Sequence, residues 1–96
     1  MTRCYLVCYD ICDEKRLRRV HKTMKGFGLA WQYSIFFCVL RDIDRVRMAT
    51  ALETEINQHE DSVLIVDLGA DETRAKAAVI IIGQGQLPAE RDVIVC

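Results

Sequence analysis

The order of strand and helix patterns limits the fold of this chain more than any single motif does. An apolar run at residues 4–11, rich in aromatic and aliphatic side chains, predicts a strand that is buried on both faces. Residues 13–25 follow with the apolar spacing of an amphipathic helix, which Asp13 caps and Gly26 ends. Residues 30–40 contain no Gly, Pro or charged residue, so they predict either one long strand or two strands joined by a tight turn.

The second half of the chain continues the same alternation. In order, it is predicted to form a helix from Asp42 or Asp44 to about Gln58, a strand at 62–68, a short helical turn at 71–77 and a strand at 78–82. The buried stripe of the second long helix is predicted to consist of Ile43, Val46, Leu52 and Ile56. The order strand, helix, one or two strands, helix, strand is the split βαβ pattern, so we expect an α+β, ferredoxin-like (βαββαβ) fold. The whole chain, 1–96, is expected to be one domain.

A fold of this kind leaves one face of its sheet to be covered. Two helices would pack on one face, and the opposite face, rich in Leu, Ile and Val, would be bare. This predicts a partner on that face, most simply a second copy of the chain. Residues 84–96 are interpreted as a C-terminal extension, whose apolar end, 93–96, is too short to stand alone. That end would join a sheet edge, either of its own subunit or of the second copy.

Positive charge is concentrated in the first predicted helix. The net charge of the whole chain is −1, which indicates no particular class of binding partner. Residues 15–25 carry no acid and these cations: Lys15, Arg16, Arg18, Arg19, Lys22 and Lys25. Such a face is either an ordinary solvated surface or a surface for a phosphate backbone, where each neutralised phosphate releases counterions. Both interpretations stay open on the residues alone.

Asp10 is expected at the last step of the first strand. The alternation of a strand puts Cys4, Leu6, Cys8 and Asp10 on one face. Carboxylates are rarely buried without a partner. Asp10 therefore either pairs locally or faces a site at the strand end, and the residues alone favour neither strongly.

The histidines and the larger aromatic residues are assigned structural roles. His21 and His59 have no second ligand at metal-site spacing and are predicted to be surface residues. Trp31, Tyr33 and Phe37 are expected in the core or in an interface, with base stacking as the alternative.

Cysteine usage favours a reducing compartment. The five cysteines are an odd number and form no C-x-x-C pair. No signal peptide is recognisable, and no apolar run approaches the roughly 18–20 residues that span a membrane. We therefore expect a cytoplasmic protein with free thiols.

The first third of the chain resembles a known family. Residues 9–20 read YDICDEKRLRRV, Gly28 follows, and residues 32–36 read QYSIF. This combination is similar to the small CRISPR-associated protein of spacer acquisition, the "Cas two" family, in which a strand ending in Tyr-Asp-Ile precedes an Arg-rich helix, a Gly and a Gln-x-Ser-Val-Phe strand. The family often has an acid after that Phe, where this chain has Phe37.

The resemblance implies a homodimer with its sheets packed face to face and the C-terminal strand exchanged onto the partner. It implies two functions: a bridge between dimers of the CRISPR integrase ("Cas one") that holds the duplex of the incoming spacer, and a Mg²⁺-dependent endonuclease acting on RNA or double-stranded DNA. For the nuclease, Asp10 from each subunit would hold the metal, with Tyr9 and Ser34 as positioning groups. The cations would grip phosphates, with Arg16 and Arg19 foremost. The alternative is a ferredoxin-like regulatory or toxin-type module outside CRISPR, without nuclease activity.

Overall fold

Seven elements follow one another along residues 1–83, the part of the chain that the computed structural model describes. They are β1 (Thr2–Asp10), α1 (Glu14–Lys25), β2 (Leu29–Gln32), β3 (Ile35–Arg41), α2 (Asp42–Glu55), β4 (Ser62–Gly69) and α3 (Glu72–Ala77). The strands form one antiparallel sheet in the order β2-β3-β1-β4. This order and the βαββαβ succession confirm the predicted ferredoxin-like fold. The predicted extension, 84–96, lies outside the described residues.

The apolar stretch at 30–40 forms two strands, which settles the alternative left open by the sequence. The turn falls at Tyr33 and Ser34, between β2 and β3. The Tyr9 amide donates a hydrogen bond of 3.1 Å to the Ser34 carbonyl oxygen, so the turn is held against the end of β1. The β2–β3 turn and the end of β1 therefore share one edge of the molecule.

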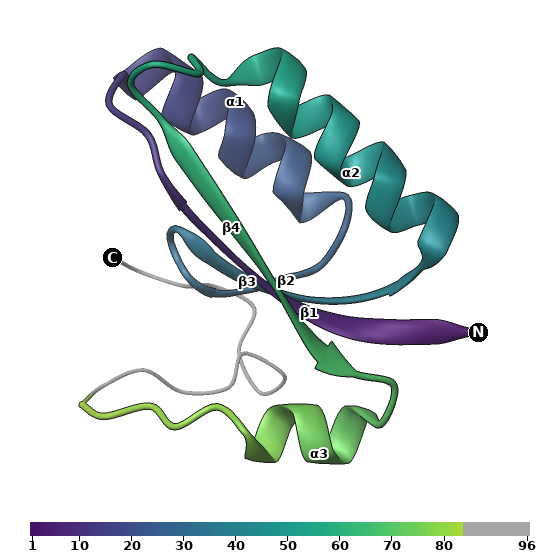
Figure 1. Cartoon of the computed structure of the whole chain (residues 1–96). Helices are drawn as coiled ribbons and strands as arrows, with labels where there is room; N and C mark the ends of the chain where they lie inside the picture. Colours follow the sequence, from purple (N-terminus) through teal and green to yellow (C-terminus); the bar gives the residue numbers. More distant parts are fainter. Residues whose placement is uncertain (84–96) are drawn as a thin grey trace.

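One face of the sheet is covered by α1 and α2, which lie side by side (Figure 1). The fully buried side chains between the layers come from both helices and from the two central strands, and the largest are Phe36, Met24, Met48, Val7 and Val20. Burying such side chains supplies most of the driving force for folding, at about 25 cal/mol for each Å² of apolar surface. Among residues 1–83, no helix is both long enough and apolar enough to cross a bilayer.

The predicted buried stripe of α2 is wrong for two of its residues. Ile43 and Val46 are 53% and 50% exposed, whereas Met48 and Leu52 are buried. At 100° per residue, Val46 and Leu52 lie roughly 120° apart around the helix axis and cannot share one narrow face. Apolar character alone was therefore a poor guide here, and the spacing already excluded the stripe.

The opposite face of the sheet is partly covered, which corrects the expectation of a bare face. Helix α3 lies there, below the sheet in Figure 1, and Ala75 packs in a second cluster of buried residues with Cys4, Trp31 and Phe37. Leu6, Leu68, Val79 and Ile81 pack against this cluster.

The strand predicted at 78–82 is also wrong. Ala78 ends α3, with its amide donating back to Arg74 and Ala75 carbonyls, and residues 79–83 form no strand. Val79 and Ile81 pack inward while Ile80 and Ile82 are exposed. The segment alternates as a strand would, but it contacts the sheet through side chains rather than through a hydrogen-bonded ladder.

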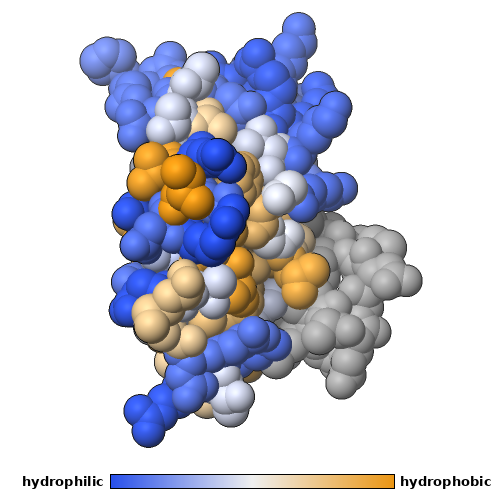
Figure 2. Space-filling model, turned by 90° about the vertical axis from the view of Figure 1, so that its right-hand side faces the viewer, coloured by the Kyte–Doolittle hydropathy of each residue, from blue (hydrophilic) through white to orange (hydrophobic). Residues whose placement is uncertain are grey.

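Apolar surface remains on the outer side of β4. Leu64 is 64% exposed and Val66 is 43% exposed, and they stand beside Cys8 and Leu6 of β1 in the sheet register. In the side view of Figure 2, hydrophobic surface lies in the middle of the molecule, between the hydrophilic helix layer and hydrophilic α3. Exposed apolar groups of this size favour an interaction surface.

Gly28 lies where no side chain fits. A Cβ at this position would stand 2.5 Å from Cys38 Sγ and 2.5 Å from the Phe37 carbonyl oxygen. We expect Gly28→Ala to lower the free energy of unfolding by about 1–3 kcal/mol, because backbone would have to shift to relieve the overlap. Urea denaturation measures the change. Gly26→Ala is the control, since its Cβ would meet only the Thr23 carbonyl oxygen, at 3.3 Å; equal stability of both variants would contradict the prediction.

Candidate functional site

Helix α1 turns a row of cations away from the core. Val20 and Met24 are buried under the helix, so the side chains opposite them face outward. These exposed cations, here called the basic face, are Lys15, Arg18, Arg19, Lys22 and Lys25. Within residues 1–83, none of them forms an ion pair.

The start of α1 is held by the cap that the sequence predicts. The Asp13 side chain accepts a hydrogen bond of 2.9 Å from the Arg16 amide. This bond lowers the pKa of Asp13, because it favours the charged carboxylate. The helix therefore begins at a defined residue, and the row of cations is presented at a defined angle.

Arg16 differs from the other cations of α1. Its Nε lies 2.8 Å from Asp61 Oδ2, and its Nη2 lies 3.2 Å from Asp61 Oδ1 and 2.9 Å from Glu60 Oε1. Its side chain is only 19% exposed. Hydrogen bonding to Asp61 raises the pKa of the guanidinium above its ordinary value. Since its positive charge is already paired, we leave Arg16 out of the surface that contacts phosphate.

Asp61 is a structural residue that the sequence reasoning missed. Its side chain is fully buried and accepts hydrogen bonds from Arg16, from the Cys12 amide at 2.9 Å and from the Asn57 amide at 2.8 Å. Arg16 first, and the two amides with it, hold the pKa of this carboxyl well below its usual range. Nothing in the sequence pairs Asp61 with an arginine 45 positions earlier.

Asp10 is the last residue of β1, as the strand pattern predicts, and it is exposed. Its side chain makes no hydrogen bond or ion pair with any residue of the described part of the chain. It lies opposite Ser62 in the register with β4. The carboxylate is therefore available to an outside ligand.

Tyr9 and Ser34, the two predicted positioning groups, differ in where they lie relative to Asp10. The Tyr9 side chain is buried on the helix side of the sheet, opposite Asp10, because adjacent strand residues point to opposite faces. Its hydroxyl donates to the Tyr33 carbonyl oxygen at 2.8 Å and lies 3.2 Å from His21 Nδ1. Ser34 lies in the β2–β3 turn at the same edge as Asp10. Tyr9 thus holds this turn and does not face the carboxylate.

His21 corrects another prediction, since it is not a free surface residue. Its ring is half-buried, stacks on Tyr33 and contacts Phe36 edge-on. His59 is exposed, as predicted.

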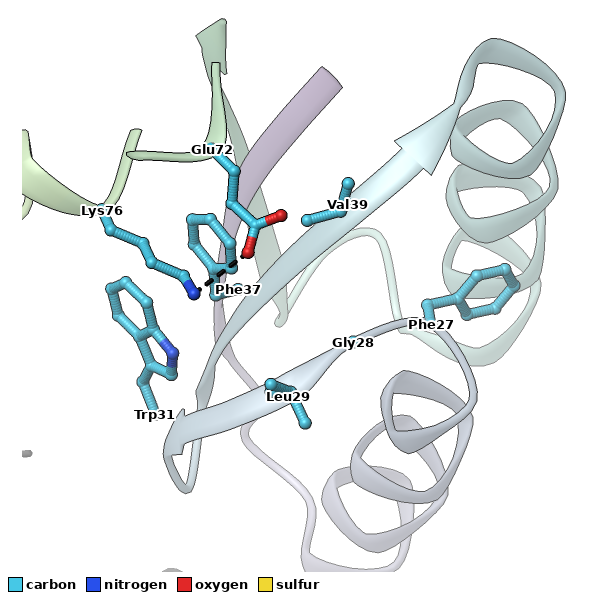
Figure 3. Close-up of a pocket in the computed structure, with 8 residues that line it drawn as sticks. All are labelled: Phe27, Gly28, Leu29, Trp31, Phe37, Val39, Glu72 and Lys76. Carbon is cyan, nitrogen blue, oxygen red and sulfur yellow. Dashed lines mark ion pairs between the residues drawn. The ribbon is translucent and has the colours of Figure 1, made fainter. Parts of the chain in front are cut away.

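A separate pocket lies on the α3 side of the sheet, and its volume is about 240 Å³. Figure 3 shows its lining: Phe27, Gly28, Leu29, Trp31, Phe37, Val39, Glu72 and Lys76. Trp31 and Phe37 stack with ring centroids 4.7 Å apart, and Lys76 pairs with Glu72 at 3.0 Å. None of the residues predicted as functional lines this pocket, so we separate it from the candidate site.

Comparisons with known proteins identify the family of the chain. A family model described as "CRISPR associated protein Cas2" matches residues 3–76. A "CRISPR-associated endoribonuclease Cas2" of Geobacter sulfurreducens is 41% identical over 95 residues, which cover 99% of either chain.

The chain belongs to the Cas2 family. A second relative, "CRISPR-associated endoribonuclease Cas2 1" of Rhodospirillum rubrum, is 50% identical over 68 residues, covering 71% of this chain and 67% of the relative. The crystal structure of Streptococcus pyogenes Cas2 at pH 6.5 is similar with a TM-score of 0.74 and 29% identity, covering 83% of this chain and 99% of that one. A hypothetical protein from Thermus thermophilus, at 24% identity, shares the fold with a TM-score of 0.76, covering 91% of this chain and 98% of that one.

A metal ion is the cofactor expected for a Cas2 nuclease, and a single chain fits it only in part. Within residues 1–83, no three His, Cys, Asp or Glu side chains are placed to hold a metal together. Asp10 offers one carboxylate. Mg²⁺ keeps several waters and takes one or two carboxylates together with substrate phosphates. The residues therefore fit Mg²⁺ only where a second copy of Asp10 or a phosphate completes the ligand set.

Proposed function

We propose that this Cas2-family protein binds nucleic acid through the basic face of α1 and serves spacer acquisition in CRISPR. The observation that carries the proposal is the row of exposed cations that form no ion pair with any of the described residues. Surface cations of this kind commonly pair with acids on the next helical turn. Left unpaired, they attract phosphates and release counterions when a backbone binds. Contacts to phosphates position a duplex without reading its sequence.

Two copies of the chain would suit a duplex better than one. The exposed Leu64 and Val66 on the outer side of β4 support pairing of sheets face to face. The proposed dimer presents two basic faces, and it would bridge integrase dimers while holding the incoming spacer. The C-terminal strand exchange that belongs to this proposal concerns residues outside the described part. Family membership favours this function over a regulatory or toxin-type module outside CRISPR.

Replacing Arg18, Arg19 and Lys22 together with alanine tests the proposal. We expect weaker binding of a blunt DNA duplex, and a plot of log affinity against log salt whose slope is shallower by roughly 2–3, because each lost phosphate contact removes about 0.9. Fluorescence anisotropy across a salt series measures both quantities. The control is Arg74→Ala, which removes an exposed cation from α3 on the other face of the sheet. An unchanged slope in the triple variant would overturn the proposal.

A second function, metal-dependent cleavage of RNA, has its own observation. The Asp10 carboxylate is exposed at a strand end with no partner in the described part, and the relatives above carry the name endoribonuclease. We propose that Asp10 from each of two copies holds Mg²⁺. When bound, the ion neutralises charge on phosphate oxygens and makes a bound water more acidic.

The remaining residues have separate roles in this second proposal. Ser34 would orient the substrate from the turn at the same edge as Asp10. Tyr9 would act through the turn that it holds, as a positioning residue. The cations of the basic face would bind the flanking phosphates. Replacement of Asp10, argued in the Discussion, tests this function independently of binding.

A further inference from the structure

One aromatic ring lies next to the basic face and is only half-buried. Trp31 and Phe37, which were expected in the core, are 4% and 3% exposed. Tyr33 differs, because it lies in the β2–β3 turn and retains part of its surface. Its ring stacks on the imidazole of His21, with ring centroids 4.4 Å apart and an angle of 18° between the planes.

Hydrogen bonds hold the backbone that carries this ring in place. The Tyr33 carbonyl oxygen accepts a hydrogen bond of 2.8 Å from the Tyr9 hydroxyl and lies 3.0 Å from His21 Nδ1. A carbonyl oxygen can only accept, so Nδ1 of His21 carries the proton. Phe36 meets the same imidazole edge-on at 5.3 Å. The Tyr33 ring is thus preorganised, and a ligand that stacks on it has little side-chain entropy to remove.

The stacked pair is adjacent to cations of α1. His21 lies three residues after Arg18 and four residues before Lys25. Side chains at these spacings are neighbours on a helix surface, with Cβ atoms about 5–6 Å apart. A nucleic-acid backbone on the basic face therefore passes close to an aromatic surface. Proteins that bind single strands combine cations, which contact the backbone, with aromatic side chains, on which the bases stack.

We propose that Tyr33, backed by His21, is a stacking site for an unpaired base of a single-stranded nucleic acid whose phosphates lie on the basic face. The inference rests on the proposed binding function and adds a preference to it. Bases inside a duplex already stack on one another and do not reach the ring. Single strands and frayed ends offer a free base, and every base has a π face, so the site tolerates any sequence.

Tyr33→Leu and Tyr33→Phe form the test pair, because the first removes the aromatic ring and the second keeps it. The ligands are RNA and DNA oligonucleotides of roughly 10 nucleotides, each carrying one 2-aminopurine, and a blunt duplex. We expect Tyr33→Leu to weaken single-strand binding by about 5- to 100-fold, the range for losing one stacked base. Duplex affinity and the salt slopes should stay unchanged, and Tyr33→Phe should restore single-strand binding. Comparison of the RNA and DNA arms shows whether the sugar matters.

Fluorescence of 2-aminopurine gives a reading that needs no variant. Stacking on the ring should quench the probe at one position of the strand bound to the unaltered protein. Absence of quenching at every position, or equal single-strand affinity in Tyr33→Leu, would overturn this inference while duplex binding stands. If the unaltered protein did not bind the duplex at all, the proposed function itself would be wrong.

Discussion

Replacing Asp10 with asparagine is expected to abolish metal-dependent RNA cleavage, with a fall in rate of at least about 100-fold, because metal-ion catalysis contributes several kcal/mol to the barrier. Asparagine keeps the shape of the side chain but lacks the charge that Mg²⁺ requires. In a dimer the substitution removes both carboxylates at once. The exposed side chain makes no hydrogen bond or ion pair in the described part, so thermal stability should hardly change. Cleavage of a labelled RNA at several Mg²⁺ concentrations measures the effect.

Two controls make the Asp10 result interpretable. Glu14→Gln removes one exposed acid at the start of α1, near the same end of β1, and should leave cleavage unchanged. Binding of duplex DNA by Asp10→Asn should be retained, because the basic face is intact. Full cleavage by Asp10→Asn would show that a contaminating nuclease is responsible and would end the catalytic proposal. If both the unaltered protein and Asp10→Asn bound duplex DNA and neither cleaved RNA, the protein would be a nucleic-acid-binding protein without nuclease activity.

Asp61→Ala is expected to cause the largest loss of stability of any single substitution considered. It would leave the Arg16 guanidinium without its buried partner and would free the Cys12 and Asn57 amides. Breaking a buried pair from one side is costly, and Arg16 would keep only the exposed Glu60 as a partner for its charge. We expect the midpoint of thermal unfolding to fall by more than about 10 °C. Circular dichroism measures it, and an unchanged midpoint would contradict this view of the pair.

The same carboxylate makes stability depend on pH in a defined direction. The folded pKa of Asp61 lies below its unfolded value of about 3.9. Its contribution is therefore complete above that unfolded value and is lost as the pH falls through the folded pKa. In Asp61→Asn, the free energy of unfolding should therefore fall less steeply as the pH is lowered. Asp67→Asn is the matched control: Asp67 also pairs with an arginine, Arg3, but its side chain is 48% exposed, so screening should leave only a small effect.

Features with local causes were predictable. Asp13 caps α1 because its side chain reaches an amide three residues on, and Val20 and Met24 are buried because helical spacing puts them on one face. The position of Asp10 at the end of β1 follows from the extent of the apolar run that precedes it. Even the special position of Arg16 had a signal, since it lies four residues before Val20 and so shares the buried side of the helix.

The sequence by itself therefore determined the order of the elements, the capped helix with its outward row of cations, and the acid that ends β1, because each depends on residues a few positions apart. The tertiary structure decided which of those cations is neutralised. It also placed α3 over part of the outer sheet face and set His21 against Tyr33. These outcomes join segments far apart in the chain, such as Arg16 and Asp61. A local pattern carries no information about which distant group will satisfy a buried charge or cover an apolar face, and only chain packing selects it.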